Sequence, residues 1–526
     1  MQNHDTRAAD AFHRATKYLA SRNAAGEEEF VMGEPPNSGP ALGEQDPAIE
    51  PLPYKRYTTL APIELPHEFP AHAMPALDAL SATGNEPAGQ RLPTLADLAR
   101  LCLLSNGLLK RGSHGTERVI EYRAAGGTGA RYHLELYLVT GELPDLAAGV
   151  YHYAANDHTL RQLRAGDYRA TLAGATGAQP ASASAPVVLA CTSTFWRNAW
   201  RYQGRAYRHT YWDAGTTFAN LLAVAASAEL PTEVVLGFAD AEVNALLAVD
   251  GEREATVALL TIGRAGTRAA PTAPEVASVR HPFQPYSARE IDFPDIPAMH
   301  QASSLASGAD ATAWRGALQP QHAAPTGELI SLTPLAELPT DPIDAVIARR
   351  RSVRHYDVDA PLPFDAFSTI VERAWHGFAA DCLDPTAGAL HAQYLIVNNV
   401  LGLQPGVYVT HPPQHAIELL RAGELRAEAA RLAVEQQYAA DGQVNSYYLT
   451  DLTPVLERFG NRGYRVAQFE AALYAGKLHL AAHALGYGAV GSTSFDDEVI
   501  DFFSPHAAGK SYMFVLVFGK RRRRQA

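Results

Sequence analysis

The sequence repeats itself at a distance of 257 residues, and this repeat limits the possible folds more than any other feature. One offset holds over about 100 residues, which indicates a duplicated domain. Two copies of domain size predict a fused homodimer, in which one chain forms both halves of a two-fold assembly. The matching positions are Tyr137 and Tyr394, Gly149–Tyr151 and Gly406–Tyr408, His158 and His415, Ala165-Gly166 and Ala422-Gly423, Tyr207-Arg208 and Tyr464-Arg465, Phe238 and Phe495, and Asp240 and Asp497.

Changes in composition divide the 526 residues into four stretches. We expect an irregular N-terminal extension over 1–90 and the first copy over 91–264. A connector rich in Ala, Pro, His and Ser follows at 265–335, and the second copy occupies 336–526. Within the extension, the pattern predicts a helix over Ala11–Arg22 and a loop over Gly33–Pro53.

Hydrophobic periodicity predicts helices and strands in both copies, which is typical of an α+β fold. The helix over Asp213–Leu230 is small and apolar on several faces, so we expect it to be buried. The predicted helices are Pro93–Leu109, Asp213–Leu230 and Ala467–Leu485, and the predicted strands are His133–Thr140, Val150–Tyr153, Pro186–Thr192 and Ala255–Ile262.

A cluster of arginines at Arg349–Tyr356 follows a further predicted helix. Asp341 is placed to cap that helix, and Pro342 suits its first turn. Cations at the helix end suit its dipole. Arginine forks beside the Ser352 hydroxyl also make an anion clamp that fits a phosphate, and the residues alone leave both interpretations open. The buried stripe of this helix is Ile343, Val346 and Ile347.

The first copy has no counterpart of this cluster, because residues 79–92 contain a single arginine, Arg91. A purely structural element would be expected in both copies. The loss therefore favours a functional role and predicts one complete binding site in the pseudo-dimer.

Charge and cysteine content exclude several classes of protein. A net charge of −12 argues against a general nucleic-acid binder. The three cysteines have no Cys-x-x-Cys spacing, which indicates reduced thiols. The N-terminus lacks a signal-peptide core, and no apolar stretch is long enough to span a bilayer. We expect a cytoplasmic protein without nucleic-acid or membrane partners.

The arginine cluster resembles the opening motif of the FMN-dependent nitroreductase superfamily, most closely that of the SagB/ThcOx-type dehydrogenases, which include azoline oxidases. The resemblance covers most of 93–264 and 341–520. It implies a mixed or antiparallel sheet covered by helices, with FMN at the interface of an intramolecular pseudo-dimer. The small residues Ala214, Gly215, Ala472 and Gly476 would let the two interface helices approach closely. Further similar stretches are Phe12–Lys17, Gly204–Arg208, Gly406–Tyr408, Gly460–Arg465 and Leu480–Gly491.

Carried over by position, the resemblance implies a set of FMN ligands. The N–H groups of Thr493 and Ser494 would face the flavin N5. Lys520 and Arg522 would add phosphate contacts, although a free basic tail explains them equally well. A glycine-rich loop would approach from the other copy, either at 126–130 or at 385–389. The implied ligands are Arg350, Arg351, Ser352, Arg354, Gly491, Ser492, Thr493, Ser494, Lys520, Arg522, Gly127 and Thr128.

Azoline oxidases use a Lys-Tyr pair to assist proton removal, and Arg201-Tyr202 matches it in the first copy. The second copy has Arg458-Phe459, which supplies no phenol. Arginine stays protonated and is a poor general base, so azoline oxidation is in question here. A contact at the interface is the alternative role for Arg201 and Tyr202.

The remaining signals favour no other cofactor. His479 and His483 have i, i+4 spacing but lack an accompanying acid, so packing or a flavin-edge contact is favoured over a metal. No P-loop or dinucleotide fingerprint occurs, so NAD(P)H, as a co-substrate, would dock over the flavin.

The sequence therefore predicts an FMN-dependent oxidoreductase that transfers hydride between flavin N5 and a small-molecule or modified-peptide substrate. The alternatives are an NAD(P)H-dependent nitro or quinone reductase and a non-catalytic flavin- or peptide-binding scaffold. The fused pair is compatible with a monomer.

Overall fold

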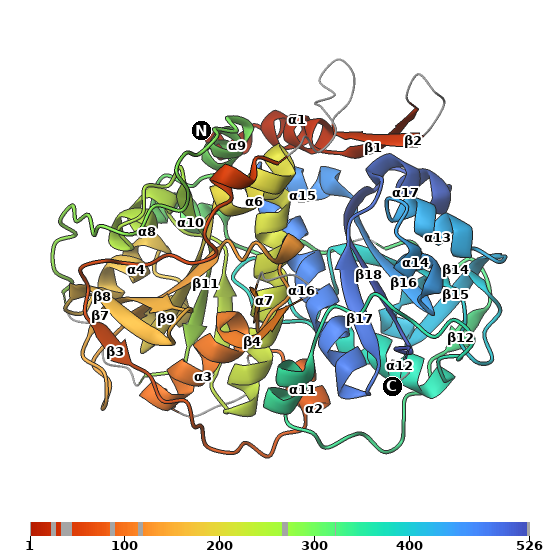
Figure 1. Cartoon of the computed structure of the whole chain (residues 1–526), viewed down its shortest axis with the longest axis horizontal. Coiled ribbons are helices and arrows are strands. Elements are labelled where there is room, and N and C mark those ends of the chain that lie inside the picture. The colour runs from red at the N-terminus through yellow and green to blue at the C-terminus, as the bar shows by residue number, and fades with distance from the viewer. Residues whose placement is uncertain are drawn as a thin grey trace.

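Two seven-stranded sheets lie side by side, and two long helices, α7 and α16, stand between them (Figure 1). The computed structural model describes residues 2–22, 28–32, 45–84, 90–113, 119–265, 272–320 and 322–522. None of the helices in these ranges has both the length and the apolar character needed to cross a membrane.

The two sheets have the same strand order, and every pair of neighbouring strands is antiparallel. This confirms the predicted α+β fold with two similar domains. The first sheet runs in the order β10 (Thr232–Val235), β11 (Glu254–Ile262), β9 (Val187–Thr194), β6 (Leu134–Thr140), β7 (Gly149–Ala154), β8 (Thr159–Ala165) and β3 (Pro62–Glu64). The second runs β17 (Gly488–Ser492), β18 (Ser511–Gly519), β16 (Val444–Thr450), β13 (His391–Val397), β14 (Gly406–His411), β15 (Ala416–Ala422) and β12 (Leu329–Ser331).

The repeat reappears in the element bounds. Adding 257 to the bounds of β6, β7, β8 and β11 gives the bounds of β13, β14, β15 and β18. The edge strands β3 and β12 come from the segments before each repeat. Two further hairpins pair β1 (Tyr18–Arg22) with β2 (Glu28–Met32) and β4 (Leu108–Ser113) with β5 (Val119–Arg123).

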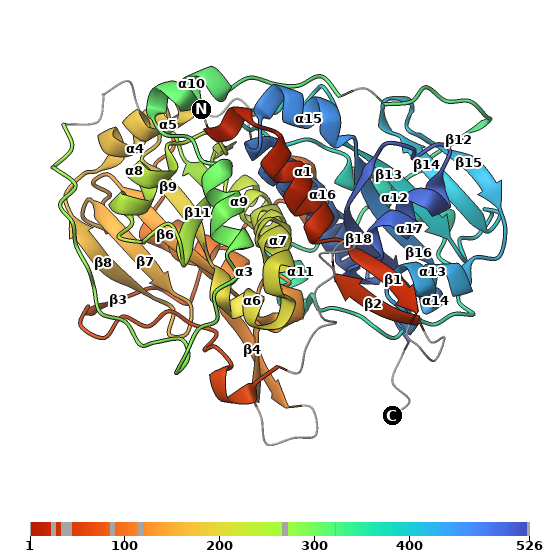
Figure 2. The same cartoon turned by 90° about the horizontal axis from the view of Figure 1, so that it is seen from above.

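Helices cover the sheets and fill the space between them (Figures 1 and 2). Those of the first repeat and of the segment before it are α1 (Arg7–Ala15), α2 (Ala76–Ser81), α3 (Leu95–Asn106), α4 (Arg169–Ala175), α5 (Pro180–Ser184), α6 (Phe195–Tyr202), α7 (Ala206–Ser227) and α8 (Asp240–Leu246), and those of the connector are α9 (Asp295–Ala302) and α10 (Gly308–Trp314). Those of the second are α11 (Ile343–Arg349), α12 (Phe364–Ala374), α13 (Arg426–Leu432), α14 (Gln437–Asp441), α15 (Leu452–Phe459), α16 (Arg462–Ala484) and α17 (Asp496–Phe503).

Helices α7 and α16 pack directly against each other because glycines remove the side chains that would separate them. A Cβ on Gly215 would lie 2.5 Å from the Phe469 carbonyl oxygen. A Cβ on Gly476 would lie 2.7 Å from the Ala219 Cβ. The expected close approach at small residues is therefore confirmed.

A second contact between the halves joins the starts of α2 and α11. Pro75 and Pro342 form an antiparallel bridge, and the Ala76 N–H donates to the Asp341 carbonyl at 2.8 Å. The prediction that Asp341 caps α11 is wrong, because its side chain pairs with Arg349 instead. Ile343, Val346 and Ile347 are buried as expected.

The N-terminal helix differs from the prediction. It ends at Ala15, and Tyr18–Arg22 forms β1 rather than continuing the helix. The segment pairs with Glu28–Met32 instead, and the Asp496 carboxylate, distant in sequence, accepts the Tyr18 N–H at 2.9 Å. In the predicted loop Gly33–Pro53, a short 3-10 turn forms at Pro47–Ile49, and residues 33–44 lie outside the described ranges.

The repeat also shifts by one residue near β10 and α8. Thr232 pairs with Ile262, whereas Gly488 pairs with Gly519, so the local offset is 256. Asp240 therefore occupies the place of Asp496. The gap-free sequence match had paired it with Asp497 instead.

Candidate functional site

The arginine cluster forms an extended segment that joins two strand ends. Ser352 bridges to Ala489, and the Val353 N–H donates to the Ala489 carbonyl at 3.0 Å. Further along, Tyr356 bridges to Arg521. These contacts bring the arginine segment beside β17 and beside the residues that follow β18. The exposed side chains gathered there are Arg351, Ser352, Arg354, Lys520 and Arg522.

The backbone at Lys520 and Arg522 is held in place rather than left as a free tail. The Lys520 N–H donates to Gln443 Oε1 at 2.8 Å, and the Arg522 N–H donates to the His355 carbonyl at 3.0 Å. Lys520 Nζ lies 5.6 Å from the centroid of the Tyr487 ring.

Within the described ranges, the cations of this segment other than Arg349, and the cations that follow β18, have no carboxylate partner. The set comprises Arg350, Arg351, Arg354, Lys520, Arg521 and Arg522. Such a concentration of uncompensated positive charge on a fixed backbone suits an anionic ligand such as a phosphate.

Arg350 reaches across the interface into the first half. Its Nε donates to the Ala124 carbonyl at 2.9 Å, while its Nη1 is buried without a hydrogen-bond partner. A Cβ on Gly126 would lie 3.6 Å from that Nη1. Burial lowers the pKa of Arg350 to about 10. A buried guanidinium nitrogen that lacks an acceptor is costly, so this position fits an anion or a carbonyl oxygen of a ligand.

His479 and His483 support the arginine segment. The Arg351 N–H donates to His483 Nε2 at 3.3 Å, and His483 Nδ1 lies 3.0 Å from the His479 carbonyl. Burial lowers the pKa of His483 to about 4, so the ring is neutral at pH 7. In the part of the chain that the structure describes, no three His, Cys, Asp or Glu side chains converge as a metal site would require.

The loop after β17 lies against both the arginine segment and the first half. Ser492 Oγ lies 2.7 Å from the Tyr438 hydroxyl. Arg354 lies close enough to Tyr438 to oppose the effect of burial, which raises the pKa of that phenol. Arg205 of the first half donates to Thr493 Oγ1 at 3.1 Å. No acceptor among the described residues takes the N–H of Thr493 or Ser494. Gly491 packs against the Phe514 ring.

The carboxylate of Asp496 fixes the position of this loop. It accepts from Arg205 at 2.8 Å and also from Arg208, and both arginines come from the first half. Burial would raise the pKa of Asp496, but the two guanidinium groups outweigh it and lower the pKa to about 2. The loop is therefore held by contacts from both halves.

The predicted glycine-rich loop lies on the other side of the interface. Asp213 on α7 accepts from the Thr128 N–H at 2.9 Å and from its hydroxyl at 2.7 Å. His133 Nε2 lies 2.9 Å from the same carboxylate. A Cβ on Gly127 would lie 3.1 Å from the Tyr132 ring, so the loop packs closely against this ring.

Tyr202 borders the same loop. A Cβ on Gly129 would lie 2.5 Å from the Tyr202 hydroxyl. Burial raises the pKa of Tyr202, and Arg201 only partly opposes that effect, so the phenol keeps its proton at pH 7. The Arg201 guanidinium carbon lies 5.6 Å from the Tyr202 ring centroid, and its Nη1 lies 3.5 Å from Gln45 Oε1.

The structure thus brings residues of the arginine segment, the loop after β17 and the glycine-rich loop to one junction between the halves. Sequence reasoning missed Arg205, Asp213 and Tyr438. The i, i+3 spacing of Arg205 and Arg208 repeats at Arg462 and Arg465, and this signal was available. Asp213 and Tyr438 gave none, because their partners are distant in sequence.

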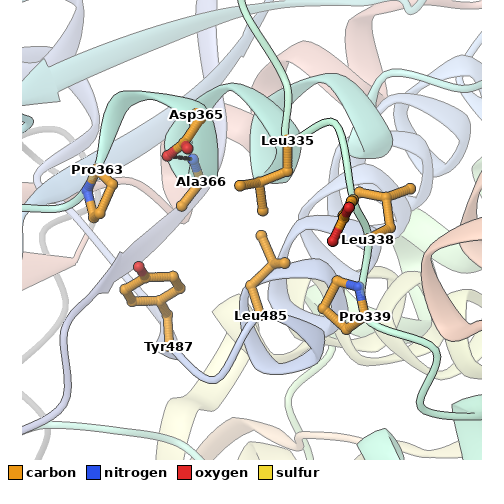
Figure 3. A pocket seen from close by; sticks show the side chains of 9 residues that line it. Leu335, Leu338, Pro339, Pro363, Asp365, Ala366, Leu485 and Tyr487 are labelled. Atoms are coloured by element: carbon orange, nitrogen blue, oxygen red, sulfur yellow. Dashed lines mark hydrogen bonds between the residues drawn. The ribbon is translucent and has the colours of Figure 1, made fainter.

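A cavity among the described residues lies away from this junction. It measures about 510 Å³ and is formed by the chain before α11, the start of α12 and the turn after α16 (Figure 3). Asp365 in its wall already accepts the Ala366 N–H at 2.7 Å. Tyr487 connects this wall to Lys520, but no residue of the predicted site lines the cavity. The lining residues are Leu335, Glu337, Leu338, Pro339, Pro363, Asp365, Ala366, Leu485 and Tyr487.

Comparison with known proteins defines the class. The family model described as "Nitroreductase family" matches residues 108–264 and 347–520. The chain therefore belongs to the nitroreductase family and carries the family domain twice.

Individual relatives agree with this assignment. A nitroreductase candidate of Methanocaldococcus jannaschii, MJ1384, is 30% identical over 165 residues, which are 30% of this chain and 81% of the relative. The trifolitoxin-processing protein TfxB of Rhizobium leguminosarum bv. trifolii is 30% identical over 147 residues, 27% of this chain and 39% of TfxB. The crystal structure of a nitroreductase candidate from Anabaena variabilis has a TM-score of 0.73 at 22% identity. It aligns with 98% of this chain over 99% of its own length, so the complete two-domain fold is shared.

Proposed function

We propose that this chain is an FMN-dependent oxidoreductase with its flavin at the junction that contains Arg350. The observation that carries the proposal is the buried Arg350 Nη1, which lacks an acceptor and points toward the glycine-rich loop. It stands at the edge of a cation cluster without carboxylates, as a flavin phosphate and ribityl chain would require.

Each part of the site has a role in binding. Arg350, Arg351, Ser352 and Arg354 would hold the phosphate and the ribityl chain, with Lys520 and Arg522 as outer phosphate ligands. Gly127 and Thr128 would border the ring system from the first half. FMN, when bound, supplies hydride transfer at N5. The Gly491–Ser494 loop would present the Thr493 and Ser494 N–H groups as fixed donors beside it.

The residues next to this site suit hydrogen-bond donation better than proton removal. Tyr202 holds its proton at pH 7 and can donate a hydrogen bond to a substrate oxygen or nitrogen. Arg201 remains a cation and would attract an anionic substrate group instead of accepting a proton. We therefore assign Tyr202 as the proton-holding group and Arg201 as an electrostatic anchor.

For the substrate, we favour a small molecule or a modified peptide, as in SagB/ThcOx-type dehydrogenases. The similarity to TfxB, whose name refers to trifolitoxin processing, supports this choice. An NAD(P)H-dependent nitro or quinone reductase is the second candidate, and the relative MJ1384, a nitroreductase candidate, favours it.

Two measurements test the proposal. The purified protein should show the flavin absorbance bands, and heat-released flavin should be FMN. A colourless protein that FMN cannot reconstitute would contradict a flavoenzyme, and bound flavin that no pair of donor and acceptor turns over would indicate a scaffold. Anaerobic NADPH then separates the candidates, because rapid bleaching favours the reductase and an unchanged spectrum favours the dehydrogenase.

A further inference from the structure

The fused dimer has a second junction between its halves, related to the first by the repeat. With the local offset of 256, Leu236 and Gly237 take the places of Ser492 and Thr493. The Thr232 N–H donates to the Gly84 carbonyl at 3.1 Å, which puts Gly84 near the position of Ser352. We call this junction the Asp381 junction and the one described above the Arg350 junction.

At the Asp381 junction, a carboxylate of the second half takes the loop N–H groups. Asp381 accepts from the Leu236 N–H and from the Gly237 N–H, each at 2.9 Å. The segment around it also bonds to β10, because the Val234 N–H donates to the Ala379 carbonyl at 2.9 Å. The N–H that is unpartnered at Thr493 is therefore satisfied at its counterpart, Gly237, from within the chain.

Aromatic side chains fill the space next to this carboxylate. A Cβ on Gly237 would lie 2.8 Å from the Trp314 ring, and Trp314 packs on Phe459 with centroids 5.2 Å apart. Trp314 Nε1 donates to the Phe459 carbonyl at 2.8 Å. Arg458 donates to the carbonyls of Arg315 and Gly316 at 2.7 and 2.9 Å. Arg458 and Phe459, the counterparts of Arg201 and Tyr202, are thus committed to packing.

The described residues at the phosphate end of this junction also form no cation cluster. A cavity of about 280 Å³ remains there, and Gly84, Glu233 and Arg264 are among its lining residues. Glu233 is the second residue of β10, and its carboxylate accepts a hydrogen bond from Gln179 Nε2 at 2.6 Å. Burial raises the pKa of Glu233, and the nearby Asp381 raises it further. A phosphate in this cavity would meet the Glu233 carboxylate, with Asp381 nearby and Arg264 as the one cation among the described lining residues, which disfavours its binding.

The difference arises in one connecting segment of each repeat. After α3, the first repeat forms the β4–β5 hairpin, which projects from the body of the molecule (Figure 2). After α12, the second repeat instead turns back to β10 at Val234 through Ala379 to Asp381. The segment at this position of the first repeat therefore leaves the Arg350 junction accessible to a ligand. The corresponding segment of the second repeat closes the Asp381 junction.

We infer that Asp381 acts as an internal ligand that closes its junction, so that each chain has one flavin-binding site. The inference rests on the proposed function for the identity of the ligand, but not for the closure itself. The first repeat then serves as a scaffold that contributes four residues to the single site, namely Gly127, Thr128, Tyr202 and Arg205.

Flavin counting is the first test. We expect one FMN per chain in the wild type, and at least a tenfold drop when Arg350→Ala and Arg354→Ala are combined. Asp381→Ala should leave the content at one per chain. Two FMN per chain in the wild type, or one retained in the Arg350/Arg354 variant, would overturn the inference.

Hydrogen exchange tests the closure without any flavin. In flavin-free protein, peptides over residues 234–239 should exchange more slowly than peptides over 491–496. Asp381→Ala should speed exchange at 234–239 at least tenfold. Asp381→Asn keeps one acceptor oxygen and should speed exchange less. This second variant controls for misfolding. Unchanged exchange in Asp381→Ala would overturn the assignment. If wild-type protein binds no FMN, the proposed function fails, but the exchange result still decides whether Asp381 closes the junction.

Discussion

At the Arg350 junction, cations from an extended segment and from the end of β18 gather without carboxylates, and the loop N–H groups of Thr493 and Ser494 have no acceptor among the described residues. At the Asp381 junction, the same helices and strands surround two carboxylates and a packed tryptophan. The shared elements show that the fold alone does not create a binding site. On the proposed function, short segments between the elements decide which junction can accept a ligand.

The contrast also separates structural from functional residues. Asp240 and Asp496 each receive two arginines from the opposite half, so this interaction holds the dimer together at both junctions. The arginine segment and Tyr202 occur at one junction only. The asymmetry within the repeat therefore supports the proposed function more strongly than any single motif does.

The largest effect should come from removing the positive charge that distinguishes the Arg350 junction from the Asp381 junction. Arg350→Ala with Arg354→Ala should weaken FMN binding by about 4 kcal/mol, because two charge-assisted hydrogen bonds are lost. Flavin fluorescence titration would measure this change. Arg264→Ala at the Asp381 junction is the matched control and should leave FMN affinity unchanged. Equal losses in both variants would mean that the two junctions do not differ as described.

The next effect concerns the helices that both junctions share. Gly215→Leu should lower the free energy of unfolding by about 3 kcal/mol, because the new side chain meets the α16 backbone. Urea unfolding followed by circular dichroism would show it. Gly174→Ala, where no heavy atom lies within 4 Å of the added Cβ, should be neutral or slightly stabilising. If Gly215→Leu is as stable as Gly174→Ala, the close helix contact is incorrect.

The paired aspartates give a smaller effect that is equal at both junctions. The pKa values of Asp240 and Asp496 are about 2, below the usual 3.8. Each carboxylate therefore adds about 2 kcal/mol of stability at neutral pH, present above about pH 4 and lost as the pH falls toward 2.

Asp240→Asn and Asp496→Asn should each flatten the acid side of the stability curve to a similar extent. Only Asp496→Asn should also reduce FMN affinity, because Arg205 links Asp496 to Thr493. Loss of FMN in both variants would contradict a single binding junction.

The smallest effect should come from removing the Tyr202 hydroxyl. Tyr202→Phe should leave flavin content unchanged and slow substrate-driven flavin bleaching about tenfold, the cost of one hydrogen bond. A thiazoline-containing peptide is the probe, in anaerobic stopped flow. The mirrored change, Phe459→Tyr, should alter neither quantity, and a rate unaffected by Tyr202→Phe would assign Tyr202 to packing.

Much of the fold could be predicted from the sequence because its determinants are local or repeated. The apolar residues predicted α3 and most of α7 and α16, although α7 begins at Ala206 and α16 at Arg462, before the predicted Asp213 and Ala467. The constant offset related the second sheet to the first. Long-range contacts were not visible in the sequence. Asp341 looked like a cap, but Arg349 takes its side chain. Tyr18–Arg22 pairs with Glu28–Met32 and its Tyr18 N–H bonds to Asp496 of the second repeat, so it forms a strand where a helix was predicted.

The candidate site shows the same division. The arginine segment was visible because several charged residues stand together in the chain. The closure of the other junction was not, because Asp381 meets Leu236 and Gly237 across 144 or 145 positions of sequence. An isolated aspartate near an alanine-rich stretch carries no sign of such a partner.

The packing of α7 against α16 within one polypeptide has an evolutionary consequence. In a dimer of identical subunits, every substitution appears at both junctions, so a residue that improves one necessarily alters the other. In this chain, a substitution in one repeat is not copied in the other, so it can alter one junction alone. A carboxylate such as Asp381 could become fixed without damage to the opposite side, and the two halves were free to diverge while remaining permanently paired.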